Sequence, residues 1–296
     1  MPLRDLALLV GICLVWAGNA VVSKVVISHF GAPPLFYAMA RFALVTLITL
    51  PWLWPIPRPL WRMIGVGLLM GGGNFALNFL GLQTTSPSDL AVVSQLGVPM
   101  ATLLSVMMLG ERIGARRGLG IALTLAGALA VMWNPYGLTP SVGLLLIAGA
   151  SFCGALGSVM MKQISGVTPL RFQAWVGFSS LWPLAALSAL AEHGQRAVLA
   201  HALWPFLGAV LFSGLLVSVI AHTAFYGLIQ KYEVNLLQPL TLMTPLATIG
   251  LGVVFTHDPF GPRMAIGAAV ALIGVVVIAL RPGQIAALLE RWRPAG

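Results

Sequence analysis

The segment Leu96-Gly97-Val98-Pro99-Met100-Ala101-Thr102 returns in altered form as Leu242-Met243-Thr244-Pro245-Leu246-Ala247-Thr248. The two copies share Leu, Pro, Ala and Thr in one register and lie 146 positions apart. The register continues upstream, where Phe-x-Gly-Leu occupies positions 79–82 and again 225–228. The chain is therefore predicted to contain two related halves, each of which forms one structural unit.

The composition is that of a membrane protein. Of the 296 residues, 59% are hydrophobic and 8% are charged, whereas soluble domains carry about 25% charged residues. Apolar stretches of about 20 residues, each long enough to cross a bilayer, recur along the chain. They predict an all-α polytopic membrane protein with ten transmembrane helices, near residues 6–27, 34–54, 62–83, 88–109, 114–133, 141–162, 169–190, 203–229, 234–255 and 263–281.

The repeat divides these spans into two sets of five. We expect a first five-helix repeat at residues 1–135, a second at 136–283, and a basic cytoplasmic tail at 284–296. Because five is an odd number, the second repeat must enter the membrane inverted relative to the first. Inverted repeats of this kind surround a central cavity near the midplane and are typical of alternating-access transporters.

The basic residues predict the orientation. With the N-terminus inside, only Arg196 and Arg263 fall on the outer side. The inner side carries twelve basic residues: Arg4, Arg58, Arg62, Arg112, Arg116, Arg117, Lys162, Arg171, Lys231, Arg281, Arg291 and Arg293. Basic residues concentrate in cytoplasmic loops, so both termini are expected in the cytoplasm, here of a bacterial inner membrane. The net charge of +9 then reflects topology, and nucleic acid is not an expected partner.

Isolated polar residues inside apolar spans are the candidates for substrate binding, because each must face protein or water. They share helical spacings of three or four residues within a span or lie beside the proline motif. The candidates are Trp16, Asn19, Asn74, Asn78, Gln95, His222, Tyr226 and Gln238. Hydrogen bonding between helices is the alternative interpretation of each.

Two prolines and two lysines extend this set. Pro99 and Pro245 each lack an N–H and clash with the carbonyl four residues earlier, so they predict a kink or hinge in spans four and nine. Lys24 and Lys162 occupy near-equivalent positions close to opposite membrane faces. They are possible gates, or simply extend their amines to the headgroups. Arg41, two turns into span two, is less easily explained, and pairing with another helix is one interpretation of it.

The ionisable residues restrict the energetics. Every Asp and Glu falls at a span end or in a loop, so no carboxylate is expected at the midplane. His222 is the one side chain well inside a span that ordinarily titrates near neutrality. The pattern favours facilitated diffusion or exchange, and proton coupling is the alternative.

Enzyme chemistry, metals and cofactors find no support in the sequence. The five histidines have no metal-ligand spacing, and Cys13 and Cys153 are isolated thiols. We therefore expect no catalytic residues, no metal and no cofactor, although a polytopic membrane enzyme or scaffold subunit stays an alternative. The expected partners are a small-molecule substrate and membrane lipid, with the chain acting as a monomer or homodimer.

The segment at 96–99, followed by Leu109-Gly110-Glu111-Arg112 before a Gly-rich span, resembles the drug/metabolite transporter superfamily of EamA type over essentially the whole chain. The resemblance implies a basket of inverted halves with a cavity lined by spans one, three, four, six, eight and nine. It also implies export of amino acids or other small metabolites, as in bacterial aromatic amino-acid exporters. Phe255-Thr256-His257-Asp258 departs from the Gly-Glu that this family often repeats in the second half.

Overall fold

The structure is a computed structural model that describes residues 2–110, 114–132, 141–161, 163–164, 166–232 and 240–279. Within these ranges the chain is helical, with no strand. The first half comprises α1 (Leu3–Ser28), α2 (Pro34–Thr49), η1 (Leu50–Leu53), α3 (Leu60–Gly67), η2 (Leu68–Gly73), α4 (Asn74–Leu82), α5 (Pro87–Val93), η3 (Ser94–Leu96), α6 (Gly97–Leu109) and α7 (Ala115–Met132). The second half comprises α8 (Val142–Met161), α9 (Pro169–Ala191), α10 (Gln195–His201), α11 (Leu203–Leu211), η4 (Phe212–Ala221), α12 (His222–Lys231), α14 (Met243–Phe255) and α15 (Pro262–Ala279).

The helices confirm an all-α polytopic membrane protein. Among the described residues, seven segments are long and apolar enough to span a bilayer: Leu3–Ser28, Pro34–Leu53, Leu60–Leu82, Pro87–Met108, Val142–Met161, Pro169–Ala191 and Leu203–Phe225. Three shorter apolar helices, Gly118–Val131, Met243–Phe255 and Pro262–Ile278, lie where the sequence predicts the remaining spans. The count of ten spans stays a prediction.

Irregular turns occur at equivalent places in the two halves. The π-helical turns η2 and η4 interrupt spans three and eight, and η2 shifted by the repeat spacing falls within η4. The 3₁₀ turn η3 lies just before Pro99, and a turn at Leu242 precedes α14 and Pro245. A proline removes one backbone hydrogen bond to the preceding turn, which explains a break on its N-terminal side. The internal repeat is therefore visible in the backbone irregularities as well as in the amino-acid sequence.

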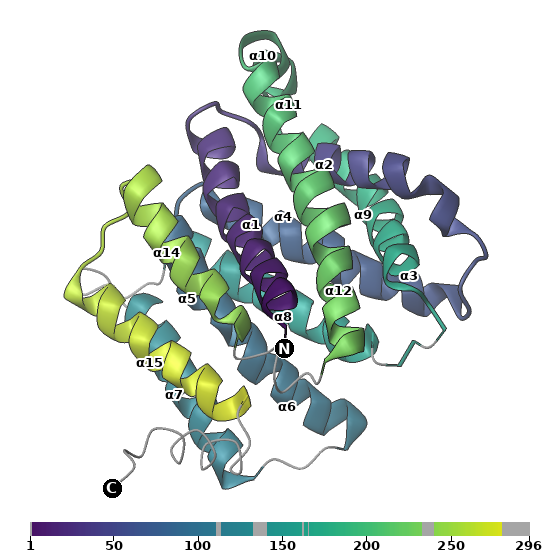
Figure 1. Cartoon of the computed structure of the whole chain (residues 1–296). Coiled ribbons are helices and arrows are strands. Elements are labelled where there is room, and N and C mark those ends of the chain that lie inside the picture. Colours follow the sequence, from purple (N-terminus) through teal and green to yellow (C-terminus); the bar gives the residue numbers. More distant parts are fainter. Residues whose placement is uncertain are drawn as a thin grey trace, which may run out of the picture.

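The pattern of helix contacts stays the same when equivalent spans of the two halves are interchanged (Figure 1). α2 packs on α9 and α7 on α15, which pairs each span with its repeat counterpart. α1 packs on α14 (spans one and nine), and α8 packs on α6 (spans six and four), so these contacts convert into one another when the halves are exchanged. The contacts of α4 with α8 and of α1 with η4 form a second such set. A pseudo-twofold relation between the halves accounts for this pattern.

Glycines from both halves bring α7 and α15 into backbone contact. A methyl group on Gly120 would lie 2.8 Å from the carbonyl oxygen of Gly274, and one on Gly267 would lie 2.9 Å from that of Gly127. Small residues allow such close approach between membrane helices. In Figure 1 the α7–α15 pair lies at one edge of the molecule, away from α2, α3 and α9. These glycines thus join the two halves of a single chain.

Candidate functional site

A cavity of about 250 Å³ lies between α1, the α5–η3–α6 segment and α14. Its wall includes three residues that the sequence predicts for the site, Trp16, Gln95 and Pro245. It also includes four hydroxyl-bearing residues, Ser94, Thr241, Thr244 and Thr248, and the apolar residues Ala20, Leu90, Ala91, Val98, Leu242 and Val275. The cavity is therefore built mainly from spans one, four and nine.

The cavity lies at the middle of the predicted spans. Trp16 is halfway along the predicted span 6–27, Val98 halfway along 88–109, and Thr244 halfway along 234–255. Binding sites of transporters with inverted repeats lie at this depth, between the halves. Both proline-motif helices contribute to the wall, α5–η3–α6 from the first half and α14 from the second.

The polar wall of the cavity is rich in hydrogen-bond acceptors. The Thr248 hydroxyl donates to the carbonyl of Thr244 at 2.9 Å, and the Ser94 hydroxyl donates to that of Ala91 at 3.2 Å. A hydroxyl whose proton is used in this way presents its oxygen lone pairs to other donors. Such a wall suits ammonium and hydroxyl groups of a ligand.

Thr244 and Thr248 are site residues that the sequence prediction missed. Both belong to the repeated proline motif, and with Thr241 they follow the spacing of one helix face. This spacing could have identified them, because the threonines lie in the same turns of span nine as Pro245, and all of these residues line the cavity.

Trp16 forms the part of the wall nearest to span eight. Its ring packs against Phe225, with centroids 4.9 Å apart, and against His222, with centroids 5.2 Å apart. Its Nε1 is buried and has no hydrogen-bond partner within the described residues. An aromatic plate with an unused donor can bind an apolar ligand body and one acceptor group.

Of the three predicted asparagines, Asn74 and Asn78 take part in helix packing, and Asn19 lies near Trp16 on α1. Asn74 donates to the carbonyl of Ala150 on α8 at 2.7 Å, and Asn78 donates to Asn74 Oδ1 at 3.2 Å. The structure therefore places this pair at the α4–α8 contact, outside the wall of the central cavity. Asn19 lies one turn beyond Trp16, and its Oδ1 is buried without a partner in the described part of the chain.

His222 lies beside a second, smaller cavity of about 40 Å³. Its Nδ1 is 2.7 Å from the carbonyl oxygen of Val217, so that nitrogen carries a hydrogen, because a carbonyl can only accept. Arg41 also lines this cavity and is completely buried. Arg41 and His222 therefore line the same small cavity inside the membrane-spanning part of the protein.

The remaining predicted residues are placed as follows. Lys24 donates to the carbonyl of Leu82 at 2.7 Å and so joins span one to the end of span three. Pro99 lies in the first turn of α6 but not in the cavity wall. The backbone of Tyr226 belongs to α12, while its side chain, like Lys162 and Gln238 as a whole, lies outside the described residues. The structure therefore brings together Trp16, Gln95 and Pro245, with His222 behind Trp16.

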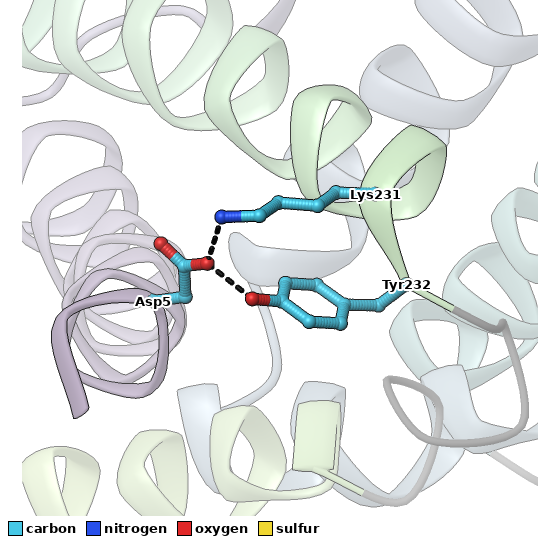
Figure 2. A network of polar contacts seen from close by, with 3 residues as sticks. All are labelled: Asp5, Lys231 and Tyr232. Atoms are coloured by element: carbon cyan, nitrogen blue, oxygen red, sulfur yellow. Dashed lines mark hydrogen bonds and ion pairs between the residues drawn. The ribbon is translucent and has the colours of Figure 1, made fainter. Parts of the chain in front are cut away.

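Polar contacts join helices at both ends of the predicted spans. At the predicted outer end, Asp258 accepts hydrogen bonds from the backbone and hydroxyl of Ser88, which begins span four. At the predicted inner end, Asp5 of α1 binds Lys231 and Tyr232, where α12 ends (Figure 2). Neither contact was predicted, since each joins residues 170 or more positions apart.

The chain is similar to transport proteins along nearly its whole length. It is 26% identical over 288 residues to the "Probable amino-acid metabolite efflux pump" of Salmonella typhimurium (strain LT2), covering 94% of this chain and 95% of that protein. The Escherichia coli (strain K12) protein of the same name is also 26% identical, over 287 residues, with the same coverage. One crystal structure covers 100% of both chains with a TM-score of 0.63 and 20% sequence identity, which shows a shared fold.

The EamA-like transporter family matches twice, once in each half, at residues 4–133 and 141–280. The two matches leave out only the connection between the halves and the chain ends. They agree with the internal repeat and the all-helical architecture described above. The chain belongs to the EamA-like transporter family.

Proposed function

We propose that this transporter exports small metabolites, and that neutral or aromatic amino acids are its substrates. The observation that carries the proposal is the midplane cavity between the two proline-motif helices and Trp16. Export and the amino-acid class are supported by the names of the two relatives described above. A non-transport role as an enzyme or scaffold has no comparable observation in its favour.

The size of the cavity favours a small substrate. Its volume of about 250 Å³ lies just below the roughly 300–1,000 Å³ of drug-sized sites. The aromatic face of Trp16 and the apolar side chains of Leu90, Val98 and Leu242 fit an uncharged body. The acceptor-rich hydroxyls opposite fit an ammonium group, so a zwitterion with an apolar side chain matches both parts of the wall.

The charges around the cavity favour transport without obligatory ion coupling. Among the described residues no carboxylate lines it, and the four acids that the structure describes, Asp5, Asp89, Glu192 and Asp258, lie at helix ends. A buried Asp or Glu is the usual carrier of a coupled proton or sodium ion. We therefore propose facilitated diffusion or exchange. Proton-coupled export of other metabolites or drugs is the second candidate, because His222 lies directly behind Trp16.

We further propose that the chain works in a bacterial inner membrane as a monomer or homodimer with both termini in the cytoplasm. The halves at 1–135 and 136–283 would move relative to one another and expose the cavity alternately to each side. The twelve basic residues on one predicted side support this orientation.

The test is a flux measurement with the full chain in liposomes. Labelled phenylalanine should enter by a saturable route with no ion gradient imposed, and unlabelled phenylalanine inside should accelerate its entry. Liposomes without protein and liposomes with the Trp16→Ala variant are the controls. For direction, cells that express the chain and are fed a phenylalanine dipeptide should release more phenylalanine into the medium. Failure of a panel of amino acids to move, or to stabilise the purified protein against heat, would contradict the proposal.

A further inference from the structure

Arg41 is a charged side chain buried within the predicted membrane-spanning part of the protein. It belongs to α2 and none of its surface is exposed. Its carbonyl oxygen would lie 3.2 Å from a methyl group on Gly214, which lies halfway along the apolar segment Leu203–Phe225. A guanidinium at such depth costs several kcal/mol unless other groups compensate its charge.

Among the described residues, the partners of this charge are all neutral. Nε and Nη2 of Arg41 both donate to the hydroxyl oxygen of Ser218, at 3.0 and 2.8 Å, and Ser218 in turn donates to the carbonyl of Ser213. The guanidinium carbon also lies 3.9 Å from the centre of the Phe75 ring. Nη1 is buried with no hydrogen-bond partner among the described residues.

The acids that the structure describes are engaged elsewhere. Each lies at a helix end and is hydrogen bonded there. Asp5 binds Lys231, Asp89 binds Ser86, Glu192 accepts from the backbone of Leu35 and Phe36, and Asp258 binds Ser88. Within the described chain, the positive charge of Arg41 therefore lacks a carboxylate partner.

The small cavity beside Arg41 has room for one anionic group. Its volume of about 40 Å³ exceeds the roughly 10–15 Å³ that one water needs, so it can admit a group the size of a carboxylate, but not a whole amino acid. The amide of Gln173, which is almost fully buried, and the ring of His222 also line it. Aromatic and aliphatic side chains form the rest of its wall.

The small cavity adjoins the substrate cavity. Trp16 lines the larger cavity, His222 lines the smaller one, and their rings are in contact. The Trp16–His222 ring pair therefore stands between a ligand body in the larger cavity and the cavity beside Arg41.

We propose that Arg41 is the binding residue for the carboxylate of the transported molecule. This inference rests on the proposed function and adds the charge class of the substrate. Nη1 donates to one carboxylate oxygen, and the Gln173 amide, which lines the same cavity, is the proposed donor to the second. A charge-assisted hydrogen bond from a guanidinium to a carboxylate is about twice as strong as a neutral one. The apolar surroundings strengthen it further, because no water screens the pair.

The test compares a carboxylate with its neutral amide. Binding of benzoate and of benzamide to the purified full chain in detergent is measured by calorimetry and by thermal unfolding, at equal ionic strength. We expect benzoate to bind about tenfold more tightly or better, and Arg41→Gln to abolish the preference. Arg41→Lys, which keeps a charge, should retain a weaker preference and serves also if Arg41→Gln does not fold. No preference in the unaltered protein, or an undiminished one in Arg41→Gln, would overturn the proposal.

Ser218→Ala is the matched control. It removes both hydrogen bonds of Arg41 to η4 but leaves the guanidinium in place. If Arg41 serves only to join α2 to η4, Ser218→Ala and Arg41→Gln should act alike, which would contradict the proposal. If it binds carboxylate, the benzoate preference should survive in Ser218→Ala. In a further arm, chloride titrated alone should stabilise the protein less than benzoate, and equal stabilisation would overturn the carboxylate assignment.

This binding measurement is independent of flux. Benzoate preference that disappears in Arg41→Gln supports the inference even if no amino acid is transported, in which case only the proposed function fails. Conversely, amino-acid flux without any preference for benzoate over benzamide supports the proposed function and contradicts the inference.

Discussion

Asp258 accepts two hydrogen bonds from a single residue, Ser88, through one carboxylate oxygen. Its Oδ2 lies 2.9 Å from the backbone nitrogen and 2.5 Å from the hydroxyl oxygen of Ser88. Its Oδ1 accepts from the hydroxyl of Thr256 at 2.6 Å. Because Ser88 lies in the first turn of α5 and Asp258 follows α14, this buried carboxylate joins spans four and nine on one side of the central cavity.

We expect Asp258→Asn to open the outer side of the cavity. An amide presents an N–H₂ group where one of these donors needs an acceptor, which costs about 1–3 kcal/mol. A cysteine placed at Thr241, in a background without Cys13 and Cys153, should then react faster with an impermeant maleimide added outside. About 1.4 kcal/mol corresponds to a tenfold change in the open population.

Asp89→Asn is the control for this experiment. Asp89 lies one position beyond Ser88, but its hydrogen bonds to Ser86 cap α5 and do not reach α14. Its loss should weaken the helix start and leave the labelling rate at Thr241 nearly unchanged. Equal acceleration in the two variants would show that Asp258 does not hold the outer end closed.

The strength of the contact between Asp5 and Lys231, at the predicted inner end, should depend on salt concentration but not on pH near neutrality. The hydrogen bond from Lys231 to the Asp5 carboxylate holds the pKa of Lys231 above its usual value. Since the folded state has the higher pKa, the contribution of this lysine is complete below its usual pKa and is lost only as pH rises through the raised one. Between about pH 6 and 9 the ammonium group stays charged.

Salt acts because Lys231 is 58% exposed. Raising ionic strength from about 0.05 M to 0.5 M shortens the screening length severalfold. Labelling of a cavity cysteine from the inner side should therefore rise with salt and remain constant with pH, and Lys231→Gln should remove the salt response. Arg4→Gln, a nearby charge change outside the contact, is the control. A response to pH between 6 and 9 with none to salt would refute this account.

Thr248→Val should reduce flux, whereas Thr102→Val should not. The two threonines occupy the same position of the repeated motif, and each hydroxyl donates to its own helix, at 2.9 Å in both cases. Only Thr248 lines the cavity. Replacing its hydroxyl by a methyl group removes one acceptor for the substrate ammonium, worth about 1 kcal/mol or roughly a fivefold rise in the half-saturation concentration. Equal effects of the two variants would mean that the threonines act in the structure alone.

Transport should proceed with equal pH on both sides of the membrane. The described residues place no carboxylate at the cavity, and a buried carboxylate is the usual proton carrier. Liposomes clamped at one pH should accumulate labelled substrate by exchange. A requirement for a pH gradient would contradict uncoupled transport. The His222→Gln variant would then test which residue carries the proton, since flux that is retained but no longer depends on pH would identify His222 as the coupling residue.

The predicted orientation can be checked with two single cysteines. A cysteine at Asn134 should react with an impermeant reagent from outside the cell, and one at Arg116 should react only after the membrane is opened. The expectation follows from the bias of basic residues to the cytoplasmic side. Reaction of both from the same side would contradict the ten-span topology.

The sequence predicts the architecture because spans, repeat and orientation depend on local and additive properties. Hydrophobic length decides whether a segment crosses the membrane, and the proline at position 99 is sufficient to place a break in its helix. A Gly-rich span also indicates close helix approach, since this is the main use of glycine in membrane helices.

The site is predictable only in part, because its contacts join residues far apart in the chain. Asn74 and Trp16 look alike as isolated polar groups, yet one bonds to α8 and the other faces the cavity. The pairing of Arg41 with Ser218 spans 177 positions. It depends on a π-helical turn that has no simple signal in the residues, since such turns arise where tertiary packing favours an extra residue.

The backbone contact between α7 and α15 determines how the halves can move. Gly120 and Gly127 interlock with Gly267 and Gly274 so closely that even a methyl group has no space. A seam of this kind can neither slide by a residue nor separate without losing most of its dispersion contacts. We therefore propose that movement of the two halves during transport preserves this contact, so that four glycines mark the part of the molecule that moves least.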